Sequence, residues 1–183
     1  NDTIDGKAGA DTLIGGSGND VFLFNTGDVA NGETITEAAG GGTDVIAIVT
    51  TTDFANMPAA SFDEIEEIRF SGSNKVGTVT GDQLSNEPIV LTETAAGISE
   101  LIINIEAGST VDLSPLTATT FTIGSDIVTI NLPNGAANVT YPNFAVTVNI
   151  GGTGTGDDTL TGGSGPDTLD GRDGNDTIEG RAG

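Results

Sequence analysis

The chain has 183 residues, 28 of them glycine, and 27 acidic against 5 basic side chains give it a formal net charge of −22. It contains no Cys and no His, which excludes disulfides, cysteine zinc sites and Ser–His or Cys–His catalytic pairs. The shortage of Lys and Arg also argues against nucleic acid as a partner. Apolar residues nonetheless make up 36 %, too many for a disordered acidic tail, so something must neutralise the charge for this chain to fold compactly.

Residues 1–24 form the first predicted unit, an arm of nine-residue repeats. The copies read NDTID, GKAGADTLI and GGSGNDVFL, with Gly at places one and four, Asp at place six and an apolar residue at place eight. The glycines permit a tight turn, and the residues around place eight suit one very short strand. Two nonapeptides then make a flattened coil of roughly 18 residues, and such coils must stack to bury their apolar sides.

Residues 25–150 form a less charged middle region that predicts short strands separated by glycine turns. The expected strands are Asp44–Val49, Glu64–Phe70, Val76–Thr80, Ile89–Leu91, Glu100–Ile105, Thr110–Leu113, Phe121–Ile123, Ile127–Leu132 and Ala145–Ile150. One short helix is expected within residues 54–67. A spacing near nine persists through Ile102, Val111, Phe121, Ile130, Val139 and Val148. This spacing favours a solenoid that continues as a parallel β-helix, and an inserted β-sandwich is the alternative.

Residues 151–183 form a second arm, with the copies TGTGDDTLT, GGSGPDTLD and GRDGNDTIE followed by GRAG. The two arms hold 16 of the 28 glycines and 10 of the 17 aspartates. Stacking sets the Asp side chains in rows about one strand spacing, ~4.8 Å, apart. Such rows repel unless a cation lies between them. Carboxylates and turn carbonyls are hard oxygen ligands, which suit Ca²⁺.

The stretches GGSGNDVFL and GGSGPDTLD match the pattern GGxGxDxUx, so the arms resemble the calcium-binding nonapeptides of the repeats-in-toxin (RTX) family. The resemblance implies an all-β, right-handed parallel β-solenoid in which two β-roll arms flank the middle region. Each ion would lie between turns two nonapeptides apart. The implied ligands are Asp2, Asp11, Asp20, Gly15 and Ser17 in the first arm, and Gly154, Gly156, Asp158, Gly163, Gly165, Asp167, Gly171, Asp173 and Asp176 in the second.

The most complete implied site joins carbonyls of Gly154, Gly156, Gly171 and Asp173 to the carboxylates of Asp158 and Asp176. Asp20 is expected to pair back to Asp2. Thr153, in place of a place-one glycine, is expected to weaken the first turn of the second arm.

The middle stretch ISELIINIEAGSTVDLSPL resembles coils of secreted RTX surface-layer proteins and adhesins. Together the two resemblances imply a bacterial extracellular protein, exported unfolded by type I secretion. The leading hypothesis is a non-enzymatic, calcium-stiffened structural module of a larger protein that forms a filament, surface layer or adhesin. The chain ends GRAG and NDTID join into a complete nonapeptide, which predicts contact with copies of itself or adjoining repeats.

Two other functions are kept open. The first alternative is an adhesin-type module that binds a carbohydrate or a cell surface. The second is part of a secreted polysaccharide-modifying enzyme, for which the middle bases Arg69, Lys75 and Tyr141 give no positive support. The apolar runs are too short to span a bilayer, so we expect no membrane insertion.

Overall fold

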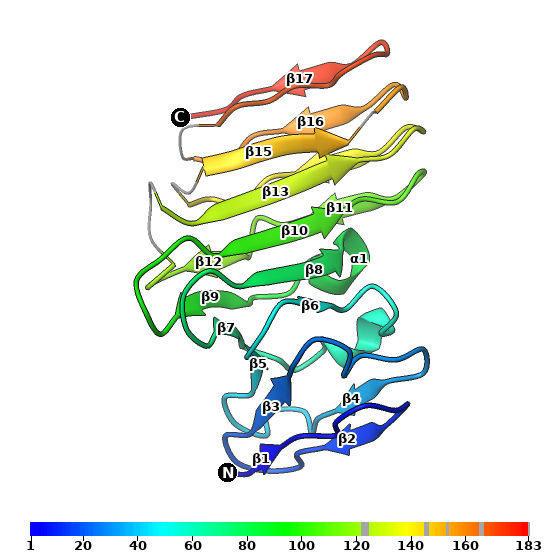
Figure 1. Ribbon diagram of the computed structural model, residues 1–183. Helices are drawn as coiled ribbons and strands as arrows, with labels where there is room; N and C mark the ends of the chain where they lie inside the picture. The colour runs from blue at the N-terminus through cyan, green and yellow to red at the C-terminus, as the bar shows by residue number, and fades with distance from the viewer. Residues whose placement is uncertain (122–124, 145–146, 153, 165–166, 183) are drawn as a thin grey trace.

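The computed structural model describes residues 1–121, 125–144, 147–152, 154–164 and 167–182 (Figure 1). The described chain is a β-solenoid of about six turns with almost no helix, and its termini lie at opposite ends of the stack. All strand pairings found in it are parallel. The predicted all-β parallel solenoid is therefore confirmed.

The strands form four parallel sheets. The first has the order β1 (Thr3–Ile4), β3 (Val21–Phe24), β5 (Val45–Ile48), β7 (Glu67–Phe70), β9 (Val90–Glu93) and β12 (Thr117–Ala118). The second has the order β15 (Thr147–Gly152), β13 (Ile127–Leu132), β10 (Glu100–Asn104), β8 (Val76–Thr80) and β6 (Thr52–Asp53). The third has the order β11 (Thr110–Asp112), β14 (Asn138–Thr140), β16 (Thr159–Thr161) and β17 (Thr177–Glu179), and the fourth pairs β2 (Thr12–Ile14) with β4 (Thr34–Thr36).

Two helical turns occupy the side of the solenoid between β4 and β11. The 3₁₀ turn η1 (Ala59–Ser61) contacts β4 and the short helix α1 (Gly81–Leu84), which in turn contacts β11. A capping box begins α1, in which the Thr80 backbone N–H donates to Gln83 Oε1 at 2.8 Å. The buried Gln83 amide also donates to the carbonyls of Phe54 and Met57, both at 2.8 Å. This side chain therefore fastens α1 to the loop that precedes η1.

The coils are shortest at the two ends of the molecule. Hydrogen bonds between neighbouring coils span 18 residues in both arms, from Asp2 to Asp20 and from Asp158 to Asp176. In the middle region the span between paired residues of neighbouring strands varies, from 20 residues between β13 and β15 to 27 between β10 and β13. At the N-terminal end β1 to β4 alternate between two sheets, whereas β16 and β17 at the C-terminal end follow each other in the third sheet. The coils from β9 to β14 use three sheets. The 18-residue coils are those expected for a pair of nonapeptides.

The third side also explains the spacing near nine in the middle region. Val111, Ile130 and Val139 are buried as expected. Val111 in β11 and Val139 in β14 pair in the third sheet, whereas Ile130 lies in β13 of the second sheet. Ile102 is only half-buried, because its neighbours Leu101 and Ile103 face the core instead. Residues 122–124 of the strand expected at Phe121–Ile123, residues 145–146 of the one at Ala145–Ile150, and the side chain of Val148 lie outside the described residues.

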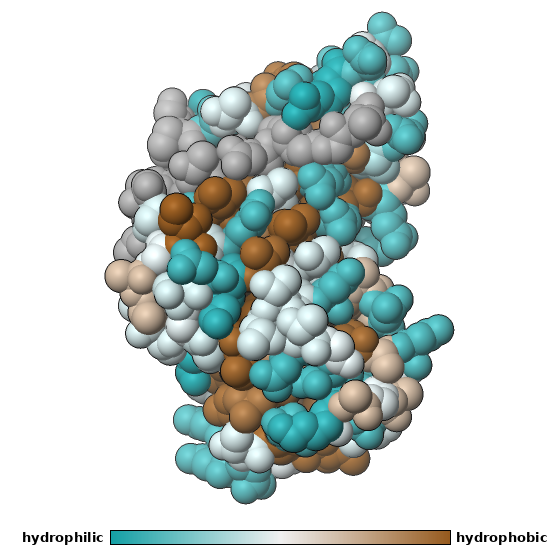
Figure 2. Space-filling view, viewed as in Figure 1, coloured by the Kyte–Doolittle hydropathy of each residue, from teal (hydrophilic) through white to brown (hydrophobic). Residues whose placement is uncertain are grey.

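One apolar core runs along the solenoid and is widest in the middle region. Phe24 and Phe54 meet edge-on with ring centroids 5.1 Å apart, and Phe70 lies 5.1 Å from Phe121. Towards the C-terminal end the core narrows, and Ile178 in β17 is 48 % exposed. Figure 2 shows hydrophilic side chains gathered over these last coils, while apolar side chains come to the surface over the middle strands.

Candidate metal centre

A ladder of carboxylates runs along the edge of the solenoid where the strands of the first sheet begin. Asp20 Oδ1 accepts the backbone N–H of Asp2 from the preceding coil. The N–H of Asp20 donates to Asp44 Oδ1 at 2.8 Å, and that of Asp44 donates to Glu66 Oε2 at 2.7 Å. Place six of the nonapeptide is therefore the residue just before a strand. One oxygen of its carboxylate accepts the backbone N–H of the corresponding residue in the preceding coil.

The same contact recurs at other edges. Ala137 donates its N–H to Asp158 Oδ1 at 2.8 Å, and Asp158 donates to Asp176 Oδ1 at 2.9 Å. In the first arm, the N–H of Asp11 donates to Glu33 Oε2 at 3.0 Å. These bonds order the edges, but each uses only one oxygen of a carboxylate.

The second oxygen of the repeat aspartates is the unusual feature of the arms. The Oδ2 atoms of Asp11, Asp20, Asp158 and Asp167 are buried, and none has a hydrogen-bond partner within the described parts of the chain. All four stand at place six of a nonapeptide. A buried carboxylate oxygen without a partner is costly, and a cation coordinated by that oxygen removes the cost. The donor set therefore fits Ca²⁺.

The place-one glycines make room for these oxygens. A Cβ at Gly15 would lie 2.8 Å from Asp20 Oδ2, and one at Gly162 would lie 2.7 Å from Asp167 Oδ2. Gly6 stands in the same relation to Asp11, at 2.9 Å. A side chain at place one would thus occupy the space next to the unpartnered oxygen, where a bound ion has to sit.

The residues of the most complete implied site lie on two stacked turns. The Gly154 carbonyl accepts the N–H of Asp173 at 3.1 Å, and the Gly156 carbonyl packs against Gly174 of the second turn. Gly171 packs on the carboxylate of Asp176. The structure thus brings these turns together.

The remaining predicted ligands are more scattered. Asp2 and Ser17 are exposed, and Gly163 packs against the carbonyl of Pro142. Gly165 and Thr153 lie outside the described residues. The two predicted partners Asp20 and Asp2 meet through the backbone N–H of Asp2.

Burial and repulsion between like charges act on carboxylates of the second arm and of the coil that follows the first arm. Burial raises the pKa of Asp158, and the neighbouring charges of Asp176 and Asp157 raise it further. Burial likewise raises the pKa of Asp167. In the coil that follows the first arm, burial together with the charges of Asp11 and Asp28 raises the pKa of Glu33. The ionised form of these groups is therefore disfavoured in the absence of a counter-charge.

A family comparison identifies the origin of this pattern. The model of the RTX calcium-binding nonapeptide repeat, in four copies, matches residues 1–28 and 152–183. The two arms carry the RTX calcium-binding repeat, which supports an RTX-type protein. The match covers both RTX arms and leaves the middle region unmatched. Neither the curated proteins nor the solved structures contain a match to the chain.

The RTX match gives the ion and a general setting. Its nonapeptides are calcium-binding motifs, so Ca²⁺ is the implied ion, and RTX solenoids are typically structural calcium-binding modules. RTX proteins are usually extracellular. Within the described ranges, no helix has the length and apolar character needed to cross a bilayer.

Sequence reasoning missed the carboxylates of the middle region that continue the ladder. Glu33, Asp44 and Asp126 are nearly fully buried, and Asp126 Oδ1 accepts the N–H of Ser99 at 2.9 Å. Their only signal is an acid directly before a short β-branched run. Of the bases considered for catalysis, Arg69 binds Glu67 through two hydrogen bonds. Tyr141 is fully buried, and its hydroxyl has no hydrogen-bond partner among the described residues.

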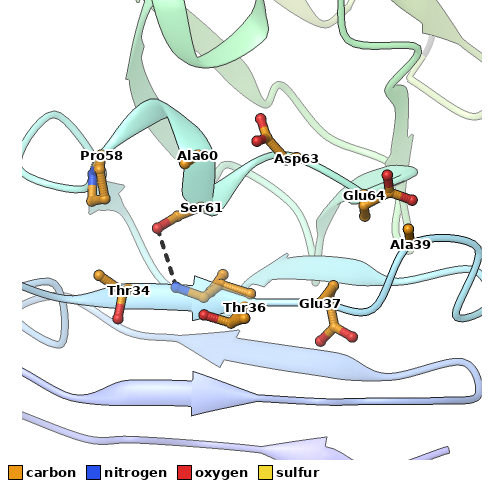
Figure 3. A pocket seen from close by; sticks show the side chains of 10 residues that line it. Thr34, Thr36, Glu37, Ala39, Pro58, Ala60, Ser61, Asp63 and Glu64 are labelled. Atoms are coloured by element: carbon orange, nitrogen blue, oxygen red, sulfur yellow. Dashed lines mark hydrogen bonds between the residues drawn. The ribbon is translucent and has the colours of Figure 1, made fainter.

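One open groove of about 460 Å³ lies between β4 and η1 (Figure 3). Small and polar residues line most of it, including Thr34, Thr36 and Ala60. Ser61 closes one part by accepting the N–H of Ile35 at 3.1 Å. The described lining includes no aromatic side chain on which a sugar ring could stack.

Proposed function

We propose that this chain is a non-enzymatic structural module of a larger secreted RTX protein, stiffened by Ca²⁺ in its two arms. The observation that carries the proposal is the set of four buried, unpartnered Oδ2 atoms at place six of the repeats. In that position the ion supplies the positive charge and the oxygen coordination that hold two adjacent coils together.

The chain's own residues prepare the site. Asp20 and Asp176 each accept an N–H group of the neighbouring coil through Oδ1 and have Oδ2 next to the place-one glycine, Gly15 or Gly171. Asp158 and Asp176 on stacked turns, with carbonyls of Gly154, Gly156, Gly171 and Asp173, are the proposed ligands in the second arm. Asp11, Asp20, Asp167, Gly15, Ser17, Gly163 and Gly165 belong to the corresponding turns.

Folding of the arms would then depend on the calcium concentration. Extracellular modules bind Ca²⁺ with dissociation constants of about 10⁻⁴–10⁻³ M, so the arms would be disordered inside a cell and ordered outside it. Binding energy then becomes folding energy. This dependence suits export of an unfolded chain by type I secretion and assembly at the cell surface.

The matching ends of the solenoid support end-to-end assembly as part of the proposal. Both terminal coils have the 18-residue length of a nonapeptide pair, and β1 and β17 are the outer strands of their sheets. Unpaired strand edges are ready to pair with another chain. Copies of this module, or adjoining repeats, would continue the stack as a filament or surface layer.

A glycine substitution tests the calcium sites. Gly171→Ala places a methyl group against Asp176 Oδ2, whereas Gly180→Ala, at the same place of the next repeat, meets no atom within 4 Å. Calcium titration followed by circular dichroism should show Gly171→Ala needing about tenfold more Ca²⁺ to order the chain, with Gly180→Ala unchanged. A wild-type protein whose spectrum and melting temperature do not respond to Ca²⁺ would refute the proposal.

A further inference from the structure

The first RTX arm meets the middle region at three carboxylates, those of Asp20, Glu37 and Asp44. One oxygen from each lies within 4.8 Å of the other two. Asp20 is 0 % exposed and Asp44 is 1 % exposed. Only Asp20 belongs to a nonapeptide, because Glu37 and Asp44 lie beyond residue 28, where the family match to this arm ends.

A second observation concerns the direction of the Asp20 side chain. Its Oδ2 atom is buried and has no hydrogen-bond partner among the described residues. A Cβ at Gly15 would lie 2.8 Å from this oxygen and in still closer contact with Glu37 Oε1. The two carboxylate oxygens therefore face the same point beside the Gly15 backbone, with no side chain between them.

Backbone contacts hold the other two carboxylates in place. Glu37 accepts the N–H of Gly15 at 3.0 Å and that of Gly16 at 3.1 Å, and Asp44 Oδ1 accepts the N–H of Asp20 at 2.8 Å. Figure 3 shows the Glu37 carboxylate directed away from Glu64 and toward the N-terminal coils. The group is thus positioned by hydrogen bonds before any ion binds, although three like charges at this distance repel one another.

We propose that Asp20, Glu37 and Asp44 bind one Ca²⁺ ion in a mixed site that fastens the first arm to the middle region. Carboxylate oxygens favour Ca²⁺ over Zn²⁺, which prefers nitrogen and sulfur ligands. The site contains three carboxylates, one more than the two place-six aspartates of a site between nonapeptides. Calcium affinity rises with the number of charged ligands, so this ion binds at lower calcium concentrations than those of the second arm.

Substitution of the two residues from the middle region tests the site. Glu37→Gln and Asp44→Asn each remove a charge and keep an oxygen that accepts a backbone N–H. The matched control is Glu64→Gln, because Glu64 accepts the N–H of Gly40 at 3.0 Å in the next coil and lies outside the group. Native mass spectrometry and isothermal titration calorimetry count the ions and measure their affinity.

We expect Glu37→Gln and Asp44→Asn each to lose one tightly bound ion, with its affinity lowered at least about tenfold, while Glu64→Gln binds Ca²⁺ as the wild type does. If folded Asp44→Asn protein retains every ion at unchanged affinity, the mixed site is refuted, even if Glu37→Gln does not fold. If Asp158→Asn loses ions while Asp44→Asn retains all of them, only the mixed site is refuted, and the calcium-binding function of the repeats is not. A wild type that binds no Ca²⁺ would overturn both.

Discussion

The RTX arms and the middle region build the same carboxylate ladder but complete it in different ways. In the arms, four repeat aspartates have a buried Oδ2 atom without a partner among the described residues: Asp11, Asp20, Asp158 and Asp167. This oxygen lies beside a place-one glycine in every case except Asp158, whose repeat begins with Thr153. In the middle, Ser99 replaces an aspartate and its hydroxyl donates to Glu93 at 2.6 Å. The repeats thus leave buried carboxylate oxygens open for an ion, whereas Ser99 and Glu93 of the middle region satisfy each other.

The two regions also differ in how much apolar surface they can bury. A coil of 18 residues has two sides and one inward side chain at each strand centre, such as Leu13 or Leu160. The longer coils of the middle region add a third side, and the core there includes the buried Phe54, Phe62 and Phe70. Apolar burial contributes about 25 cal/mol per Å², so the middle is expected to fold without calcium.

Chelation should unfold the arms and leave the middle region folded, and this is the largest effect that we expect. Removing Ca²⁺ should raise amide exchange in residues 1–24 and 154–182 to the level of an unfolded chain, because binding energy there is folding energy. Amides of β8, β10 and β13 should remain protected by at least about a hundredfold, since core strands open only with the whole domain. Hydrogen exchange with mass spectrometry measures both regions in one sample. Equal protection of arms and middle after chelation would contradict the contrast.

The sequence predicted the arms better than the middle, because each nonapeptide specifies its own turn and strand. Place eight lies within a strand at Leu13, Phe22, Leu160 and Ile178, whereas Leu169 of the repeat GGSGPDTLD lies outside the strands. In the middle, the bounds of Val76–Thr80 and Ile127–Leu132 matched those predicted. The strands β4, β6, β12 and β14 were missed, because two or three residues give no measurable alternation.

The helical turns and the mixed carboxylate group show where local reasoning fails. The short helix expected within residues 54–67 is the single 3₁₀ turn η1, while α1 was not predicted although Thr80 and Gln83 form a capping box. Glu37 and Asp44 gave no signal as ligands. Their meeting with Asp20 depends on the length of the connecting coil, which no repeat fixes.

A substitution in the apolar core tests whether the stability of the middle region is independent of Ca²⁺. Phe70 is 0 % exposed and packs against Phe121, so Phe70→Ala should lower the free energy of unfolding by about 3–5 kcal/mol. The loss should be the same with and without Ca²⁺, because no carboxylate of the arms is involved. Ile14→Ala is the control, since Ile14 is 63 % exposed, and its effect should stay within about 0.5 kcal/mol. Urea unfolding followed by circular dichroism gives both values. A Phe70→Ala effect that vanishes on adding Ca²⁺ would mean that the ions, and not the apolar core, hold the middle region.

The response to pH should have opposite signs with and without the ion, and this is the smallest effect that we expect. Burial raises the pKa of Asp158 and of Asp167 above the ordinary aspartate value of 3.8. A carboxyl group whose pKa is higher in the folded than in the unfolded state stabilises the folded state at pH values below its unfolded-state pKa. That contribution is lost as the pH rises through its folded-state pKa. Protein dialysed free of calcium should therefore show a second arm that is less stable at pH 7 than at pH 4. With Ca²⁺ present the order reverses, because protons then compete with the ion for the same oxygens.

The double variant Asp158→Asn and Asp167→Asn distinguishes the effect of these two carboxylates from that of the other acidic side chains. It should flatten the calcium-free response of the second arm and leave that of the first arm, whose backbone N–H groups bind Glu33 and Glu37 of the middle region. Burial raises the pKa of these two side chains as well. Hydrogen exchange at pH 4 and pH 7, corrected for the intrinsic exchange rate, resolves the two arms. If both arms of the variant respond as in the wild type, the pH dependence arises from net charge rather than from these carboxylates. Adding Ca²⁺ to the wild type then shows whether the sites are filled. Only coordination by these oxygens makes the second arm more stable at neutral than at acid pH.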